Sequence, residues 1–182
     1  MSRALDLAER EIHVWRRDGA SASFVLQVLG AYCGRDLRPG ALRRSPLGKP
    51  FLDGEALSFS VSRSGGATVV AVSRGEVGVD LERVAPLADL DALAACCLAQ
   101  AEAEILAALP PEARTRFFYK CWTRKEACLK ALGVGLTVEP RGIDTTRDDG
   151  PWHWLEPWSD APFALCVASV DRDARVVERL AR

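Results

Sequence analysis

The feature that most constrains the fold is a long segment in the second half of the chain, residues 112–132, which contains neither glycine nor proline. Two prolines, Pro110 and Pro111, interrupt the chain directly before it, and Gly133 follows its last residue. Prolines before a helix and a glycine after it are typical signals of where a helix begins and ends. Because strands are rarely so long, the segment predicts one continuous α-helix.

Two lysines and a glutamate lie on one side of this expected helix. Phe118, Trp122, Glu126 and Lys130 are spaced four residues apart, so they fall along one stripe, with Lys125 beside it. A carboxylate and two ammonium groups would then project toward one point. The plain alternative is an exposed helix on which Glu126 and Lys130 form an ordinary ion pair, worth about 0.3–0.5 kcal/mol.

A second group of charges lies in residues 77–82, which read VGVDLE. Apolar residues alternate there with small or acidic ones, and this period of two predicts a strand with Gly78, Asp80 and Glu82 on the same face. Two carboxylates so close repel each other unless a cation lies between them, and hard oxygen ligands suit Mg²⁺. A solvated outer face of a sheet would explain the same pattern without a metal.

The two patterns together resemble the signature of the Sfp-type 4′-phosphopantetheinyl transferases, which is Gly-x-Asp-x-Glu followed by Trp-x-x-Lys-Glu-Ala-x-x-Lys. Here the first motif is residues 78–82 (GVDLE) and the second is residues 122–130 (WTRKEACLK). The likeness runs in order from about residue 24 to residue 145. Three flanking segments extend it: residues 48–50 (GKP), 59–65 (FSVSRSG) and 133–136 (GVGL).

The resemblance implies an enzyme. Members of this family move the phosphopantetheine arm of coenzyme A, the co-substrate, onto a serine of an acyl or peptidyl carrier protein, with Mg²⁺ as cofactor, and release adenosine 3′,5′-bisphosphate. It also implies an α+β fold with two similar lobes, each a small antiparallel sheet with helices, related by a pseudo-twofold axis. We expect the lobes to be residues 1–85 and 86–182, with the active site in the cleft between them and the protein a monomer.

The resemblance also implies roles for residues of this sequence. Asp80, Glu82 and Glu126 are expected to bind Mg²⁺. The expected catalytic residues are Asp80, Glu126 and Lys130, with Glu126 taking the serine proton directly or through water. The expected contacts to coenzyme A come from Lys49, Ser62, Arg63, Lys125, Lys130 and Arg44. Glu102 falls where the family often has a further acidic residue by the metal.

One departure from the family pattern bears on activity. The family's middle motif usually reads Phe-Asn-x-Ser-His-Ser, whereas this chain has Ser60 in place of the Asn and Arg63 in place of the His. Arginine keeps a positive, multidentate phosphate donor, yet it cannot act as a neutral acid or base near neutral pH. The alternative is therefore a catalytically weakened homologue that binds coenzyme A or a carrier protein. A plain structural protein with no affinity for coenzyme A is the third interpretation.

Apolar periodicity and turn residues predict the remaining elements. Strands are expected at residues 11–17, 57–63, 67–74, 76–84, 152–157, 163–170 and 175–180, and helices at 21–33, 87–98 and 101–109. The strands between residues 57 and 84 are expected to form an antiparallel meander, because Gly65-Gly66 and Arg74-Gly75 are typical hairpin turns. His13 would be an exposed strand residue, Ser21 would cap the first helix, and residues 35–55 would form a surface loop.

Composition argues against two classes of partner. The net charge of −1 gives no general attraction to nucleic acid, and no apolar run is long enough to cross a membrane. The N-terminal residues include early acids and no hydrophobic segment of the secretory kind, so a cytoplasmic location is expected. Six cysteines without C-x-x-C spacing then indicate buried free thiols rather than disulfides or a zinc site.

A basic stripe on the long helix suggests how an acidic partner would dock. Arg116, Lys120 and Arg124 are spaced four residues apart, so they share one face. Carrier proteins are acidic, and we expect this stripe to attract them. A solvated helix face explains the same three residues equally well.

Overall fold

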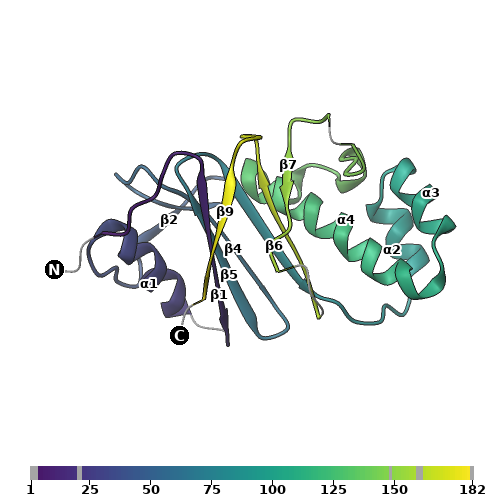
Figure 1. Ribbon diagram of the computed structural model, residues 1–182, viewed down its shortest axis with the longest axis horizontal. Coiled ribbons are helices and arrows are strands. Elements are labelled where there is room, and N and C mark those ends of the chain that lie inside the picture. The colour runs from purple at the N-terminus through teal and green to yellow at the C-terminus, as the bar shows by residue number, and fades with distance from the viewer. Residues whose placement is uncertain (1–3, 20–21, 148, 159–161, 181–182) are drawn as a thin grey trace.

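The computed structural model of the protein describes residues 4–19, 22–147, 149–158 and 162–180 (Figure 1). Its strands are β1 (Glu11–Asp18), β2 (Leu42–Arg44), β3 (Pro50–Leu52), β4 (Ser58–Ser64), β5 (Ala67–Ser73), β6 (Val77–Arg83), β7 (His153–Leu155), β8 (Phe163–Ser169) and β9 (Arg175–Leu180). Its helices are α1 (Ala22–Cys33), α2 (Leu90–Cys97), α3 (Gln100–Ala108) and α4 (Pro111–Leu132), with 3₁₀ turns η1 (Gly135–Thr137) and η2 (Pro140–Gly142). The expected elements are confirmed, the expected loop contains the hairpin β2–β3, and Ser21 lies outside the described residues.

The strands form two larger sheets and one short hairpin. The first sheet has the order β4-β5-β1-β9, the second has the order β6-β8-β7, and β2 pairs with β3. Each larger sheet takes a strand from the other half of the chain, because β9 lies parallel to β1 and β6 lies antiparallel to β8. Figure 1 shows the yellow β9 beside the purple β1. The α+β class is confirmed, but the expectation of purely antiparallel sheets is wrong for the first sheet, because β9 runs parallel to β1. The division at residue 85 and the pseudo-twofold relation stay predictions.

The expected three-strand meander is wrong at its third strand. β4 and β5 do pair antiparallel, but β6 leaves this sheet and pairs with β8. The face of β6 that carries Gly78 packs on α4. A Cβ atom added at Gly78 would lie 1.8 Å from the carbonyl oxygen of Ala127 and 2.6 Å from the backbone nitrogen of Ala131. Only glycine lets the strand approach the helix so closely.

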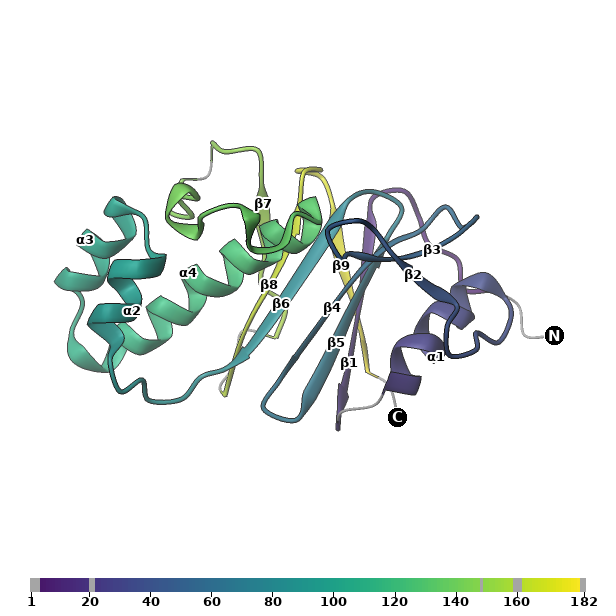
Figure 2. The same cartoon turned by 180° about the vertical axis from the view of Figure 1, so that it is seen from behind.

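The long helix α4 is confirmed, with the ends that its flanking residues predict. Pro111 lies in its first turn, and Gly133 has a φ of 68°, the left-handed conformation in which glycine ends a helix. α4 lies across β6 and β8, and α2 and α3 pack against it (Figure 2). Phe118 and Cys121 join the apolar cluster between these three helices, against which Trp122 is partly buried.

The first sheet buries a histidine that the sequence analysis expected to be exposed. His13 of β1 is only 1% exposed, because β1 lies between β5 and β9 and α1 covers this face. Its Nδ1 lies 2.7 Å from the hydroxyl of Tyr32 on α1, and its Nε2 lies 3.1 Å from the carboxylate of Glu11. Burial lowers the pKa of His13 and raises the pKa of Tyr32 to about 12. The expectation failed because alternation alone does not say whether a strand is central or at an edge.

The cysteines follow the expectation of buried free thiols only in part, since Cys33 and Cys97 are half-buried. All six are free, and Cys121, Cys128 and Cys166 are buried. Cys96, near the end of α2, is exposed, so the expectation of a buried thiol is wrong there. Among the described helices, none has the length and apolar character that crossing a membrane requires.

Candidate active site

The two sequence motifs meet where β6 lies against α4. The ammonium of Lys130 lies 2.5 Å from Asp80 Oδ1 and donates to the hydroxyl oxygen of Ser62 over 3.1 Å. Ser62, on β4, donates its own hydrogen bond to the same carboxylate oxygen over 2.8 Å. The Asp80 side chain is 3% exposed and the Lys130 side chain is 31% exposed, so the ion pair is closed to solvent at Asp80 and open to solvent at Lys130.

Serines of β4 bridge the two sheets. Ser60, Ser62 and Ser64 alternate along the strand, and all three bond to β6. Ser60 and Ser64 accept hydrogen bonds from backbone N–H groups of β6 over 3.0 and 2.9 Å, and Ser64 donates one to Glu82 over 2.8 Å. Ser60, which replaces the family Asn, therefore supports the strand that carries the carboxylates. Ser64 was not among the expected site residues, although the period of two among these serines was the available signal.

Three carboxylates share this region with one close cation. Burial raises the pKa of Asp80, of Glu82 and of Glu126. The negative charge of Asp80 raises the pKa of the two glutamates further, whereas the charge of Lys130 lowers the pKa of all three groups. An ionised carboxylate that raises the pKa of its neighbours repels them when they are ionised too, so an added cation would stabilise the group.

The oxygen donors of this group suit a hard divalent cation. Asp80 Oδ2 is buried and has no hydrogen-bond partner, and the Glu126 carboxylate makes no hydrogen bond or ion pair within the described ranges. Within those ranges, no three acidic, histidine or cysteine side chains are already gathered closely enough to hold an ion. The residues therefore fit a metal through their chemistry and their unused oxygen atoms rather than through a preformed cage.

A groove opens beside Glu126 and Lys130. Its first part is a cavity of about 270 Å³, whose lining from four segments includes Lys49, Pro50, Phe59, Val61, Glu126, Lys130, Gly133 and Gly135. Its second part, a hollow of about 340 Å³, shares Pro50, Phe59 and Val61 with the first and reaches Arg44 and Arg63. The groove therefore has one carboxylate and two lysines in one part and two arginines in the other.

The expected phosphate-binding residues lie in separate places along this groove. Lys49 donates to the backbone carbonyl of Ala131 at the C-terminal end of α4, where a cation is favoured, and burial lowers the pKa of Lys49. Arg44 is exposed and donates to a carbonyl of its own hairpin over 2.8 Å. Ser62 and Arg63 point to opposite faces of β4, because successive strand residues alternate. Ser62 therefore lies at the carboxylates, and Arg63 lies at the second hollow.

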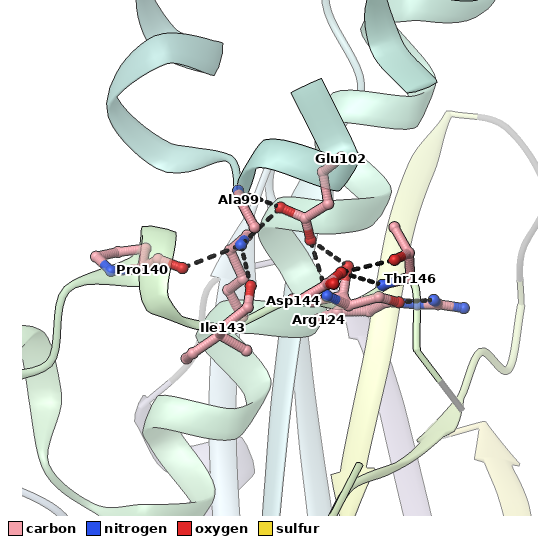
Figure 3. Close-up of polar contacts among 9 residues, drawn as sticks. Ala99, Glu102, Arg124, Pro140, Ile143, Asp144 and Thr146 are labelled. Atoms are coloured by element: carbon pink, nitrogen blue, oxygen red, sulfur yellow. Dashed lines mark hydrogen bonds and ion pairs between the residues drawn. The ribbon is translucent and has the colours of Figure 1, made fainter. Parts of the chain in front are cut away.

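Lys125 and Glu102 lie elsewhere, contrary to the expectation that they face the diphosphate and the metal. Both side chains are 0% exposed, and their charged groups are 2.7 Å apart. Lys125 also donates hydrogen bonds to the backbone carbonyls of Pro140, over 3.0 Å, and of Ile143. Figure 3 shows Glu102 and these two carbonyl groups pointing into the same buried region. Position 125 turns away from the groove because it lies about 100° around the helix from Glu126.

The basic stripe of α4 is partly neutralised within the chain. The Glu156 carboxylate forms ion pairs with Lys120, at 3.3 Å, and with Arg124, at 2.8 Å. Arg124 donates a further hydrogen bond to the backbone carbonyl of Thr145 over 2.8 Å. Lys120, with 46% of its side chain exposed, is therefore the more accessible of these two cations.

Comparison with known proteins assigns this fold and site to a family. The sequence profile of the 4′-phosphopantetheinyl transferase superfamily matches residues 76–176. The matched residues contain β6, α4 and β8, which carry the carboxylates and Lys130 or pack directly against them. The chain belongs to this superfamily.

Individual relatives support the same assignment. The chain is 35% identical over 173 residues to the 4′-phosphopantetheinyl transferase HetI of Nostoc sp., which covers 85% of this chain and 70% of that protein. It is 31% identical over 105 residues to a 4′-phosphopantetheinyl transferase of Bacillus subtilis, and 38% identical over 101 residues to AcpT of Salmonella typhi. These two matches cover 57% and 54% of this chain but only 46% and 52% of the relatives, about half of their length.

Proposed function

We propose that this protein transfers the 4′-phosphopantetheine arm of coenzyme A to a serine of an acyl or peptidyl carrier protein. The observation that carries the proposal is the pairing of Asp80 on β6 with Lys130 on α4 at the edge of a groove, in a chain of this superfamily. The reaction forms a bond between the serine oxygen and phosphorus and releases adenosine 3′,5′-bisphosphate. Because one chain supplies both walls of the groove, we also propose that a monomer is sufficient.

Asp80, Glu82 and Glu126 would hold Mg²⁺ through their unused oxygen atoms. When bound, the ion would neutralise charge that develops on the diphosphate during the displacement. This assignment is supported by the raised pKa values of the three carboxylates, since an unbalanced group of acids is stabilised by a divalent cation.

The chain's own side chains would bind and orient the substrates. Lys130 presents a partly exposed ammonium at the groove, where it can hold diphosphate oxygens and stabilise the leaving bisphosphate. Glu126 borders the same cavity, and its raised pKa makes it a better acceptor for the serine proton than an ordinary glutamate. Arg44 and Arg63 line the second hollow, so they would contact the nucleotide phosphates there.

The carrier protein would dock on α4 near Lys120. Reversing this charge in Lys120→Glu should weaken carrier binding, because like charges then face each other, while coenzyme A binding stays unchanged. Lys120 is preferred to Arg124 for this test because Arg124 also supports the Thr145 backbone. Equal loss of both binding activities, or of neither, would contradict this docking face.

The decisive experiment is a loading assay with the purified protein, labelled coenzyme A, Mg²⁺ and a panel of carrier proteins, read as a mass increase of the carrier. Transfer that disappears in Asp80→Ala supports the proposed enzyme. Tight coenzyme A binding without transfer to any carrier supports the catalytically weakened homologue. That alternative is considered because Arg63 replaces the family His. Absence of coenzyme A binding would overturn both proposals.

A further inference from the structure

A buried ion pair on the far side of α4 controls one wall of the groove. We propose that Glu102 and Lys125 are positioning residues that hold residues 133–145, here called the groove loop, in the conformation that binds coenzyme A. The inference rests on the proposed function for its ligand. The restraint on the loop, however, can be measured without any ligand.

Glu102 connects three separate segments of the chain. One carboxylate oxygen accepts from the backbone N–H of Ala99 and from Lys125, both over 2.7 Å. The other oxygen accepts from the backbone N–H of Thr145 over 3.0 Å and from its hydroxyl over 2.6 Å. The first turn of α3, the middle of α4 and the end of the groove loop are therefore joined through a single carboxylate. Because this carboxylate is fully buried, each of these bonds is costly to leave unmade.

Lys125 holds the middle of the groove loop in the same way. Its ammonium has three N–H bonds, and its three partners are Glu102 and the backbone carbonyls of Pro140 and Ile143. Figure 3 shows these carbonyls beside Glu102, with Arg124 close by. Arg124 adds a hydrogen bond to the carbonyl of Thr145 over 2.8 Å. The loop is therefore tied to α4 by charged groups at several points along its length.

The other end of the groove loop forms part of the groove itself. Gly133 and Gly135 line the cavity beside Glu126 and Lys130. A Cβ atom added at Gly133 would lie 2.8 Å from the side chain of Lys49, so the loop also meets the hairpin on the opposite wall. Lys125 is adjacent in sequence to Glu126, so the turn of α4 that is fixed to the loop is the turn that presents Glu126 to the groove. Weakening the buried ion pair should therefore increase the amplitude of the groove loop's motion at the place where coenzyme A would lie.

The test compares amide hydrogen exchange of the groove loop in the free protein with the dissociation constant for coenzyme A alone. In Glu102→Gln, the amide nitrogen cannot accept the bonds that one carboxylate oxygen accepts. We expect exchange over residues 133–145 to rise about tenfold and the dissociation constant to rise by a similar factor, with β1 and β5 unchanged.

Thr145→Val is the milder second variant, because it removes only the hydroxyl donor and keeps the ion pair. It should raise both quantities about threefold, and it keeps the test valid should Glu102→Gln fail to fold. Arg147→Ala is the matched control, since Arg147 forms an exposed ion pair with Asp149 just beyond the loop and does not touch Glu102 or Lys125. It should change neither quantity.

A purely structural role for the pair predicts a different result, in which the variants lose global stability while loop exchange and coenzyme A affinity of the folded protein stay unchanged. That result, or faster loop exchange with unchanged affinity, overturns the inference. An unmodified protein that fails to bind coenzyme A overturns the proposed function instead. The exchange measurement would still decide whether the pair restrains the loop.

Discussion

α4 contributes a lysine to each of two lysine–carboxylate pairs, which differ in the exposure of the lysine and in how many of their polar atoms have partners. The sealed pair, Lys125 with Glu102, is 0% exposed on both sides, and each of its charged atoms has partners within the chain. The open pair, Lys130 with Asp80, leaves Lys130 31% exposed and Asp80 Oδ2 without a partner among the described residues, and burial raises the pKa of Asp80. A complete set of bonds indicates a pair that holds chain segments in place, whereas an incomplete set at a groove indicates a binding site.

The geometry of the helix explains why the two pairs differ. Lys125 and Lys130 are five positions apart, which turns their side chains about 140° from each other around the helix axis. One therefore points toward α3 and the groove loop, and the other points toward β6. The same residue type is thus fully buried among partners on one side of the helix and borders the groove on the other.

The largest expected effect breaks the sealed pair. Lys125→Met leaves Glu102 as an unpaired buried charge, so the free energy of unfolding should fall by about 3–5 kcal/mol. Lys130→Met is the comparison variant and should lower it less, by about 1–3 kcal/mol, because Lys130 is partly exposed and the Asp80 carboxyl, whose pKa burial already raises, can take up a proton. Chemical denaturation of both variants measures the difference, and equal losses would mean that the two pairs do not differ as described.

Neutralising the open pair should instead remove activity. Asp80→Asn keeps the size of the side chain but loses the negative charge, so we expect transfer to carrier protein to fall about 10³-fold. The free energy of unfolding should not fall, because a buried carboxylate with an unsatisfied oxygen is replaced by a neutral group. The loading assay and denaturation, run on the same preparation, check both parts. Activity that survives the substitution would remove Asp80 from the site.

A steric substitution tests how closely the open pair depends on the contact between β6 and α4. In Gly78→Ala, the new methyl group collides with the Ala127 carbonyl, so the free energy of unfolding should fall by about 1–3 kcal/mol. Coenzyme A loading should fall with it, because Asp80 would move relative to Lys130. Gly75→Ala, where a Cβ atom would meet nothing within 4 Å, is the control and should change little.

The smallest expected effect concerns pH. Burial and the charge of Asp80 raise the pKa of Glu126 above its ordinary value of 4.5, so the folded protein binds more protons than the unfolded chain just above that pH. Stability should therefore fall as pH rises through this window, and the cost is absent below it. Glu126→Gln removes this cost, so the variant should be more stable than the unmodified protein near neutral pH and equally stable near pH about 4. Denaturation curves at both pH values, without divalent cations, test the sign.

The local parts of the fold follow from the sequence, and the long-range parts do not. α4 is predictable because its proline and glycine boundaries are local signals, and the alternation around Asp80 correctly placed Gly78, Asp80 and Glu82 on one face of β6. The pairing of β6 with β8 was missed because alternation identifies a strand but not its neighbour.

The site shows the same division between local and distant information. Asp80 and Lys130 were expected in the same site, Asp80 as a metal ligand and Lys130 at the diphosphate, and the structure brings their side chains into contact. Lys125 was expected beside them, but its partners are Glu102, Pro140 and Ile143. These residues belong to segments distant in sequence, and residue spacing does not predict that such segments come together. Its position also lies at the border of the helix face, where a rotation of a few tens of degrees decides which side it joins.

The parallel pairing of β9 with β1 has a consequence for how the protein is made. β1 leaves the ribosome well before β9, which follows the whole α4 region, so one edge of β1 stays unpaired until β9 has been made. Nascent chains stalled before residue 175 should therefore expose a strand edge that chaperones or other nascent chains can bind.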